Sequence, residues 1–294
     1  MTESTLVVSR HPTRELAIMI TTTSRRNFLR SSTLAVTASV IGSTLESMLT
    51  TQAETRPSFS PSVVKALFFD VFGTLVDWRA GVSRDAESIL KPLGYSIDWK
   101  AFADTWRDEY QPGMEEVRSG RIPYTKLDVL HRRMLQKILP RFGLEKLDAS
   151  ALDQLTLAWH RLDAWKDVPA GLAKLRQGYL IAPVSNGNVA LMSDLARRND
   201  FHWDAILGAD LARDYKPKAA VYLAAVDAFN LQPSQCIMCA AHGGDLKAAA
   251  DNGLKTAFIA RPQERPGVSE TAPNVAVDIV ARSIEELAAK LSKG

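Results

Sequence analysis

The sequence predicts an α/β protein: a doubly wound parallel sheet with a helical cap inserted after the first strand. Three observations predict this class. Short apolar runs alternate with helical stretches between residue 62 and residue 294. One long helical segment, residues 80–167, separates the first apolar run from the second. The apolar content, 46% of 294 residues, is ample for a hydrophobic core of that size.

Six apolar runs have the length of strands that are buried on both faces, as in a parallel sheet. They are Val64–Asp70, Tyr179–Ser185, Asp204–Ala209, Gln235–Ala241, Thr256–Ala260 and Val275–Val280. The helical stretches between and after them are Pro169–Gln177, Val189–Arg198, Lys218–Phe229, Asp245–Asn252 and Ser283–Lys290. Pro169 and Ser283 suit helix starts and Gly253 suits a helix end, so this alternation indicates a doubly wound sheet.

The segment between the first two strands shows only helical periodicity. Helices are expected around Arg84–Leu93, Trp99–Arg118, Tyr124–Leu139 and Ala149–Leu162. An insertion of about 90 residues is too long for a loop, so residues 80–167 are predicted to form a helical cap on a core of residues 62–79 and 168–294. Over the carboxyl ends of the strands, such a cap encloses a site, excludes water and favours small substrates.

The first 53 residues have the features of an export signal rather than of the fold. Ser24–Arg30 reads SRRNFLR, which resembles a twin-arginine signal. A Ser/Thr/Ala-rich, weakly apolar run follows over residues 31–49, and Thr51–Ala53 offers a small-residue cleavage site. The alternative is a tail in which two arginines happen to adjoin. Because the run is too polar for a membrane anchor, we expect a periplasmic or otherwise exported protein without an anchor in its mature form.

The charge balance indicates a small-molecule partner. The formal net charge is +3, but residues 1–53 contain five arginines and three acidic residues, and the remainder carries 31 basic and 30 acidic residues. A nearly neutral body has no electrostatic footprint for nucleic acid. We therefore expect no nucleic-acid partner.

The sharpest signal is a carboxylate at the end of the first predicted strand. Residues 68–77 read FFDVFGTLVD, which places Asp70 directly after a continuous apolar run. A charge at such a position is costly unless it is paired or used. Gly73 permits close approach of the backbone, and the Thr74 hydroxyl can orient a neighbouring group. The residues alone allow a catalytic Asp70 or a carboxylate that caps a turn or helix.

Three further polar segments follow later apolar runs in order. Ser185–Asn188 follows the second strand, Lys216 opens a helix within Tyr-Lys-Pro, and Asp245 lies in Gly-Gly-Asp-Leu after the fourth apolar run. With Asp70, these residues resemble motifs I to IV of the haloacid dehalogenase superfamily over residues 62–294. The resemblance implies a Rossmann-like core, a cap and a covalent aspartyl intermediate.

Two departures favour one branch of that superfamily. Its phosphatases carry a second Asp as general acid, where this chain has Phe72, and further carboxylates for Mg²⁺ after motif IV, where Leu-Lys-Ala-Ala-Ala follows Asp245. A halide needs neither an acid nor a metal to leave. The chain therefore resembles type II 2-haloacid dehalogenases, which implies a small halogenated carboxylic acid as substrate, no metal and no cofactor. A Mg²⁺-dependent phosphatase and a non-catalytic exported binding protein of this fold are the alternatives.

The resemblance also implies roles for the site residues. Asp70 attacks the carbon that bears the halogen, and water then hydrolyses the resulting ester. Lys216 keeps Asp70 ionised, and Asp245 orients Lys216 or activates the water. The substrate-binding residues that the motifs imply are Phe72, Thr74, Ser185 and Asn186.

The cap contributes one candidate, Arg107. Residues 106–110 read WRDEY and resemble a dehalogenase segment in which Trp-Arg is followed by Tyr at another spacing. The resemblance implies that Arg107 faces the carboxylate of the substrate or the departing halide, and a guanidinium fork suits either anion. The alternative is a surface arginine on an amphipathic helix. Caps in this family often help to form dimers, so a homodimer is a candidate assembly.

The residues before Asp245 depart from the better-known dehalogenase pattern. Typical members read Ser-Ser-Asn-x-Trp-Asp, whereas residues 240–245 of this chain read AAHGGD. His242 takes the position of the Asn. It is a candidate base or hydrogen-bond donor to the hydrolytic water, with a titration near neutral pH, or else a neutral side chain that fills space. The change leaves the halogen and chain length of the substrate open, a smaller fluorinated acid included.

Overall fold

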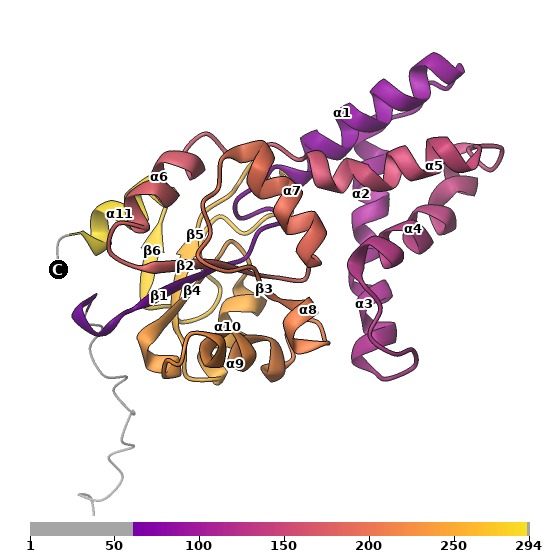
Figure 1. Cartoon of the computed structure of the whole chain (residues 1–294). Helices are drawn as coiled ribbons and strands as arrows, with labels where there is room; N and C mark the ends of the chain where they lie inside the picture. Colours follow the sequence, from indigo (N-terminus) through magenta and orange to yellow (C-terminus); the bar gives the residue numbers. More distant parts are fainter. Residues whose placement is uncertain (1–60, 293–294) are drawn as a thin grey trace, which may run out of the picture. The chain divides into compact units, whose positions relative to one another are not determined.

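The computed structural model describes residues 61–292 and contains a six-stranded sheet in the order β3-β2-β1-β4-β5-β6 (Figure 1). All neighbouring strands are parallel. The strands are β1 (Ala66–Phe69), β2 (Leu180–Ser185), β3 (Leu207–Gly208), β4 (Cys236–Ala240), β5 (Lys255–Ile259) and β6 (Ile279–Ala281). The predicted doubly wound parallel sheet is confirmed. The export signal predicted over residues 1–53 lies outside the described residues.

Helices cover both faces of the sheet and fill the insertion after β1 (Figure 1). Those beside the sheet are α6 (Val168–Leu175), α7 (Val189–Asn199), α8 (Ala209–Ala212), α9 (Ala219–Ala228), α10 (Gly243–Asp251) and α11 (Ile284–Leu291). Those of the insertion are α1 (Trp78–Leu90), α2 (Trp99–Asp108), α3 (Tyr110–Arg118), α4 (Leu127–Ile138) and α5 (Ala149–Thr156). The cap boundary predicted at residue 80 falls inside α1, because the Asp77 side chain caps this helix by accepting the N–H of Ala80. Within residues 61–292, no helix combines the length and hydropathy needed to cross a membrane.

Alternate residues of β1 pack on opposite faces of the sheet. Leu67 and Phe69 join an apolar cluster that includes α6, α7 and α11, whereas Ala66 and Phe68 pack with α9 and α10. All four side chains are fully buried, and burying each Phe stabilises the fold by roughly 1.5–3 kcal/mol. This packing fixes β1 on both sides, so the residue that follows it is held at the carboxyl edge of the sheet.

The third and sixth strands are shorter than predicted, because aspartate side chains replace the backbone in the first ladder positions. The Asp204 carboxylate accepts the N–H of Ile181 at 2.8 Å, and the Asp278 carboxylate accepts the N–H of Thr256 at 2.9 Å. The residues before β3 and β6 therefore have an irregular backbone, while the backbone N–H groups of the neighbouring strands β2 and β5 still have hydrogen-bond acceptors.

The helix predicted over Trp99–Arg118 is two helices, α2 and α3, which meet at Glu109. Pro112 explains the break, because it has no N–H to donate to a continuous helix and is tolerated only in a first turn, where α3 places it. The break sets the guanidinium of Arg107, near the end of α2, 4.1 Å from the ring centre of Tyr110, at the start of α3.

Candidate active site

A cavity of about 330 Å³ lies at the carboxyl edge of the sheet, between the core and the cap. The parallel strands bring residues from distant parts of the sequence to this edge: one follows β1, one follows β2, and one lies in the first turn of α10 after β4. Helices α2 and α3 contribute the opposite side of the cavity. Seven of the nine predicted site residues line it: Asp70, Phe72, Arg107, Asn186, Lys216, His242 and Asp245.

Asp70 is a buried carboxylate with a cation on each side. Its backbone N–H donates to the carbonyl of Cys239 at 3.0 Å, which fixes it beside the end of β4. Oδ1 accepts a hydrogen bond from Nζ of Lys216 at 2.9 Å, whereas Oδ2 lies 2.8 Å from the Thr74 hydroxyl and 3.0 Å from Nδ1 of His242. Burial raises the pKa of Asp70, but Lys216 and His242 outweigh it and hold that pKa well below its usual range. Asp70 is therefore ionised at neutral pH.

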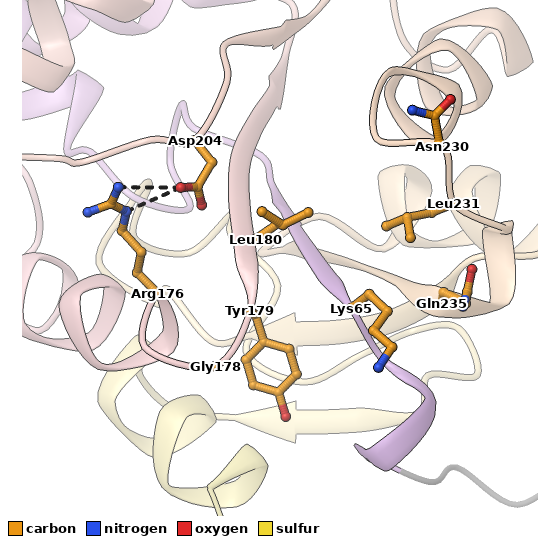
Figure 2. A pocket seen from close by; sticks show the side chains of 9 residues that line it. All are labelled: Lys65, Arg176, Gly178, Tyr179, Leu180, Asp204, Asn230, Leu231 and Gln235. Carbon is orange, nitrogen blue, oxygen red and sulfur yellow. Dashed lines mark hydrogen bonds and ion pairs between the residues drawn. The ribbon is translucent and has the colours of Figure 1, made fainter.

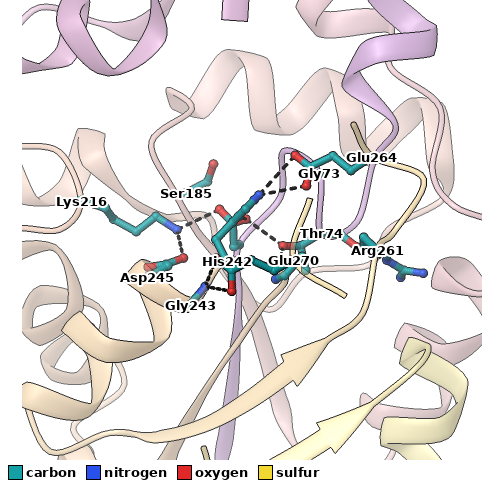
Figure 3. A network of polar contacts seen from close by, with 12 residues as sticks. Gly73, Thr74, Ser185, Lys216, His242, Gly243, Asp245, Arg261, Glu264 and Glu270 are labelled. Carbon is teal, nitrogen blue, oxygen red and sulfur yellow. Dashed lines mark hydrogen bonds and ion pairs between the residues drawn. The ribbon is translucent and has the colours of Figure 1, made fainter. Parts of the chain in front are cut away.

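Lys216 lies between two carboxylates (Figure 3). Its Nζ donates to Asp70 and, at 2.5 Å, to Oδ2 of Asp245. Burial lowers the pKa of the lysine, but the two carboxylates outweigh it, so the pKa of Lys216 lies above its usual value and the side chain stays charged. Its backbone is held as well: its N–H donates to Oδ1 of Asn186, and its carbonyl accepts from Arg118 of the cap, both at 2.8 Å.

Asp245 is the carboxylate on the far side of Lys216. It lies in the first turn of α10, and its Oδ1 accepts the hydroxyl of Tyr222 on α9 at 2.6 Å. Burial is the largest influence and raises the pKa of Asp245 above its ordinary value, although Lys216 opposes this. A carboxylate with a raised pKa is a better proton acceptor than an exposed one.

His242 is neither a space-filling side chain nor free to titrate near neutral pH. Its Nδ1 lies against Asp70, and its Nε2 lies 3.1 and 3.2 Å from the two carboxylate oxygens of Glu264 (Figure 3). Burial lowers the pKa of the imidazole, but the hydrogen bonds and charges of the two carboxylates raise it to about 10. Both ring nitrogens therefore carry protons and donate, and His242 is an imidazolium at neutral pH.

Two predicted substrate-binding residues do not line the cavity. Thr74 is fully buried; its hydroxyl donates to Asp70 and accepts the N–H of Ala241 at 2.9 Å, so it acts through Asp70. Ser185 is also fully buried, and its hydroxyl accepts the N–H of Gly187 at 3.1 Å, which shapes the loop after β2. Both were predicted to bind substrate, but in the structure their hydroxyls contact the protein beside the cavity.

The cap side of the cavity is lined by Arg107, Tyr110 and Gln111, and aromatic rings pack behind it. The cap wall is defined as Arg107 together with these packed side chains, Trp106, His131 and Trp159. The His131 ring stacks on Trp159 with centres 4.3 Å apart, and Trp106 meets Trp159 edge-on at 5.6 Å. Among the side chains of residues 61–292, Nη1 of Arg107 and both ring nitrogens of His131 are buried without a hydrogen-bond partner. Of these, only Arg107 lines the cavity.

Tyr222 and Glu264 are side chains with polar contacts at the site that were not among the predicted site residues. Tyr222 lies on α9, where its position suggested only a core side chain, yet it lines the cavity and binds Asp245. Glu264 lies in the loop after β5, which carries no periodic pattern. The signal that could have found it is the location of this loop, because it leaves the same sheet edge as the segments that hold Asp70 and His242.

A second, wider cavity of about 670 Å³ lies near the amino ends of β1, β2 and β4 (Figure 2). Arg176 and Asp204 lie on one side of it and contact each other at 3.4 Å (Figure 2). Carboxyl ends of strands, rather than amino ends, form the binding edge of open α/β sheets. The smaller cavity with Asp70 is therefore the candidate active site.

The charged residues at this site do not suit a divalent cation. Among residues 61–292, no group of three or more His, Cys, Asp or Glu side chains is arranged to hold a metal ion. Every carboxylate oxygen of Asp70 and Asp245 already accepts a hydrogen bond. Mg²⁺ needs several free oxygen ligands in near-octahedral order, and the ammonium and imidazolium beside these oxygens repel it.

Comparisons with known sequences point to one family. The family model for haloacid dehalogenase-like hydrolases matches residues 64–253. The (S)-2-haloacid dehalogenase 4A of Burkholderia cepacia is 31% identical over 214 residues, which cover 71% of this chain and 88% of that protein. The (S)-2-haloacid dehalogenase 1 of Pseudomonas sp. (strain CBS-3) is 28% identical over 209 residues, covering 68% and 88%.

Solved structures agree with the sequences. The defluorinating L-2-haloacid dehalogenase Rha0230 superposes with a TM-score of 0.76 at 41% identity, covering 78% of this chain and 95% of that one. The L-2-haloacid dehalogenase PA0810 gives a TM-score of 0.75 at 43% identity, covering 79% and 100%. The predicted resemblance to 2-haloacid dehalogenases is confirmed.

Proposed function

Because the chain belongs to the haloacid dehalogenase-like hydrolase family, we propose that it hydrolyses the carbon–halogen bond of a small 2-haloalkanoic acid through an ester on Asp70. The observation that carries the proposal is Asp70 itself, an ionised carboxylate lining a closely bounded cavity between two cations. Across the cavity, the guanidinium of Arg107 has a buried nitrogen without a partner, which suits an anionic substrate.

In the first step, Oδ1 of Asp70 is the proposed nucleophile. It accepts one hydrogen bond, whereas Oδ2 accepts two, so a lone pair remains on Oδ1. This pair forms a bond to carbon 2 of the acid while the carbon–halogen electron pair leaves with the halide. Halide departure needs no proton, which agrees with apolar Phe72 at the position of a phosphatase's general acid. Arg107 binds the carboxylate of the substrate or the departing halide.

In the second step, water attacks Cγ of the Asp70 ester and gives one proton to Asp245. When the resulting intermediate collapses, the Cγ–Oδ1 bond breaks and its electron pair stays on Oδ1. That oxygen takes a proton from Lys216, and Lys216 takes the proton held by Asp245, 2.5 Å away. The 2-hydroxy acid leaves, and Asp70 releases its remaining proton because its pKa lies below the usual range.

One assay tests this proposal. Halide release from 2-chloropropionate and from fluoroacetate is measured beside hydrolysis of p-nitrophenyl phosphate, each with and without EDTA. We expect halide release that EDTA does not change, that Asp70→Asn abolishes, and that Asp251→Asn, an exposed carboxylate on α10, retains. Phosphate release that EDTA abolishes would indicate a phosphatase instead, and no turnover of any substrate would indicate a binding protein.

Location and assembly are part of the proposal. The twin-arginine resemblance of Ser24–Arg30 supports export of the folded chain to the periplasm. Replacing both Arg25 and Arg26 by Lys is expected to leave uncleaved chain in the cytoplasm, as measured by cell fractionation. A homodimer is proposed from the family resemblance of the cap, and sedimentation equilibrium of the mature protein checks it.

A further inference from the structure

Glu264 is a buried carboxylate that neither step above uses. Its side chain is 8% exposed, and its two oxygens meet Nε2 of His242 and the indole N–H of Trp78, the latter at 2.8 Å. Burial raises the pKa of Glu264, but the hydrogen bond and charge of His242 outweigh it, so the pKa lies below its ordinary value and the group is ionised. A buried charge is costly unless a partner compensates it, and here the partner is the residue that touches Asp70.

The backbone around Glu264 is built to bring it close to the catalytic loop. Gly73 has φ +89°, and a Cβ at this position would lie 2.0 Å from Oε1 of Glu264. A glycine is therefore needed both for the backbone conformation and for the approach of the carboxylate. Arg261, three residues earlier, donates to the carbonyl of Thr74 at 2.8 Å and forms a two-bond ion pair with Asp167 at 2.8 and 2.9 Å. These contacts fix the loop after β5 to the loop after β1.

We propose that Glu264 is a positioning residue for hydrolysis of the Asp70 ester: it keeps His242 in place, and charged, as the hydrogen-bond donor to Oδ2 of Asp70. This inference rests on the proposed function and deepens it. Because Oδ1 bonds to the substrate, Oδ2 becomes the carbonyl oxygen of the ester. When water attacks Cγ, the electron pair of the Cγ–Oδ2 π bond moves onto Oδ2, and the imidazolium of His242 and the hydroxyl of Thr74 donate to the resulting oxyanion.

The charge of His242 depends more on Glu264 in the ester than in the free enzyme. In the free enzyme two carboxylates, Asp70 and Glu264, hold the proton on His242. Alkylation neutralises Asp70, so Glu264 is then the one carboxylate still in contact with the imidazolium. During hydrolysis, negative charge develops on Oδ2, so the hydrogen bond from His242 strengthens and lowers the barrier. In the first step the negative charge of Asp70 decreases, so the same hydrogen bond gives no such advantage.

The surrounding charges do not replace Glu264. Lys216 and Asp245 lie beyond Asp70, on the Oδ1 side. The positive charge of Arg107 favours the ionised form of Glu264. Asp77 is a more distant acid, and its pKa is raised mainly by burial and to a lesser degree by the charge of Glu264. No other described contact of the His242 ring nitrogens involves a charged group.

The test follows the two steps separately in the full-length chain. Glu264→Gln is mixed rapidly with excess 2-chloropropionate, the halide burst is measured by ion chromatography, and the Asp70 ester is measured by intact-protein mass spectrometry after acid quench. We expect a burst of about one halide per enzyme at close to the unmodified rate, accumulation of the ester, and hydrolysis slowed roughly 10- to 100-fold. Gln263→Ala, an exposed neighbour in the same loop, is the control and should show neither change.

A pH profile separates positioning from a general loss of structure. In the unmodified enzyme, the rate of ester hydrolysis should fall on the alkaline side below pH 10, because the His242 pKa of about 10 depends partly on the charge that Asp70 loses in the ester. In Glu264→Gln it should fall at a clearly lower pH still. Glu264→Asp, which keeps the charge, should return the alkaline limit toward that of the unmodified enzyme. Equal slowing of both steps without ester accumulation, or an unmoved alkaline limit, would overturn the proposal. Absence of halide release from the unmodified enzyme would instead count against the proposed function.

Discussion

The core side and the cap side of the cavity differ in whether their polar side chains have partners. On the core side, every charged side chain has a partner of opposite charge at 2.5–3.1 Å. These side chains form the catalytic floor, defined as Asp70, Lys216, His242, Asp245 and Glu264. On the cap wall, aromatic rings pack against each other while Arg107 and His131 keep buried nitrogens without a partner among the described residues.

The difference indicates a division of labour. Ion pairs hold the catalytic floor in place before substrate arrives, so its side chains are already oriented when charge develops during the reaction. The cap wall supplies shape, exclusion of water and one cationic donor with unused capacity, which are the properties that select a small anion. Substitutions in the catalytic floor should therefore change the rates of the chemical steps. Substitutions in the cap wall should chiefly change substrate or halide binding, or have no effect.

The largest effect is expected at Lys216. In Lys216→Met, Asp70 and Asp245 would face each other across the site without the cation between them, and the pKa of Asp70 would rise. We expect halide release to fall roughly 10²- to 10³-fold at pH 7.5, because the positioned ammonium that holds Oδ1 of Asp70 is lost. Ion chromatography measures it, with Lys218→Met, an exposed lysine at the start of α9, as control. Activity within tenfold of the unmodified enzyme would contradict an electrostatic role for the floor.

Arg107 tests the wall. Arg107→Met should lower kcat/KM roughly 10- to 100-fold, because a hydrogen bond to a charged group contributes about 1.5–3 kcal/mol. A rise in KM indicates that Arg107 binds the substrate carboxylate, and a fall in kcat indicates the departing halide. Steady-state kinetics with 2-chloropropionate distinguish the two. If kcat/KM were unchanged, Arg107 would be a packing residue of α2, and Arg107→Lys should then also be neutral.

The charge of His242 should be visible in stability. Its folded-state pKa of about 10 lies above the ordinary 6.5, so the stabilisation is full below pH 6.5 and is lost as pH rises through about 10. Thermal unfolding of the unmodified enzyme and of His242→Gln is measured from pH 6 to pH 10.5. The difference between their melting temperatures should shrink steadily over that range. A constant difference would show that His242 is not charged in the folded enzyme.

The smallest effect is expected at His131. Burial lowers its pKa to about 3, so the ring is neutral, and its nitrogens have no partner among the described residues. Replacing an unsatisfied buried polar ring by an apolar one of similar shape is close to neutral or stabilising, so His131→Phe should change the free energy of unfolding by less than about 1 kcal/mol in the destabilising direction. Urea unfolding and kcat/KM check it. A large loss of activity would indicate that His131 contacts the substrate rather than only packing within the cap.

The fold was predictable because apolar periodicity reports burial directly. Strands β1, β2, β4 and β5 are buried on both faces and were found, whereas β3 and β6 were overextended because side chains of Asp204 and Asp278 take backbone positions. The apolar pattern alone does not distinguish an aspartate that follows the end of a strand from an aspartate whose side chain accepts a hydrogen bond in place of the backbone of a neighbouring strand. The single helix predicted over residues 99–118 was wrong for a reason that the sequence did contain, the proline at position 112.

The site was most predictable near strand ends and helix starts, although Lys216, expected to open a helix, lies in the turn before α9. Asp70, Lys216 and Asp245 meet because parallel strands end at one edge. Thr74 donates to Asp70 as the sequence suggested, whereas the Ser185 hydroxyl accepts from the backbone of its own loop, because hydroxyl direction depends on local backbone geometry. Glu264 was missed because its loop is irregular.

The hydrogen bond from Arg118 to the carbonyl of Lys216 joins the lid to the catalytic lysine. A movement of α3 away from the core would break this bond and leave Asn186 as the remaining contact that holds the main chain of Lys216. The position of α3 is thereby coupled to the main chain of the residue whose ammonium lies between Asp70 and Asp245.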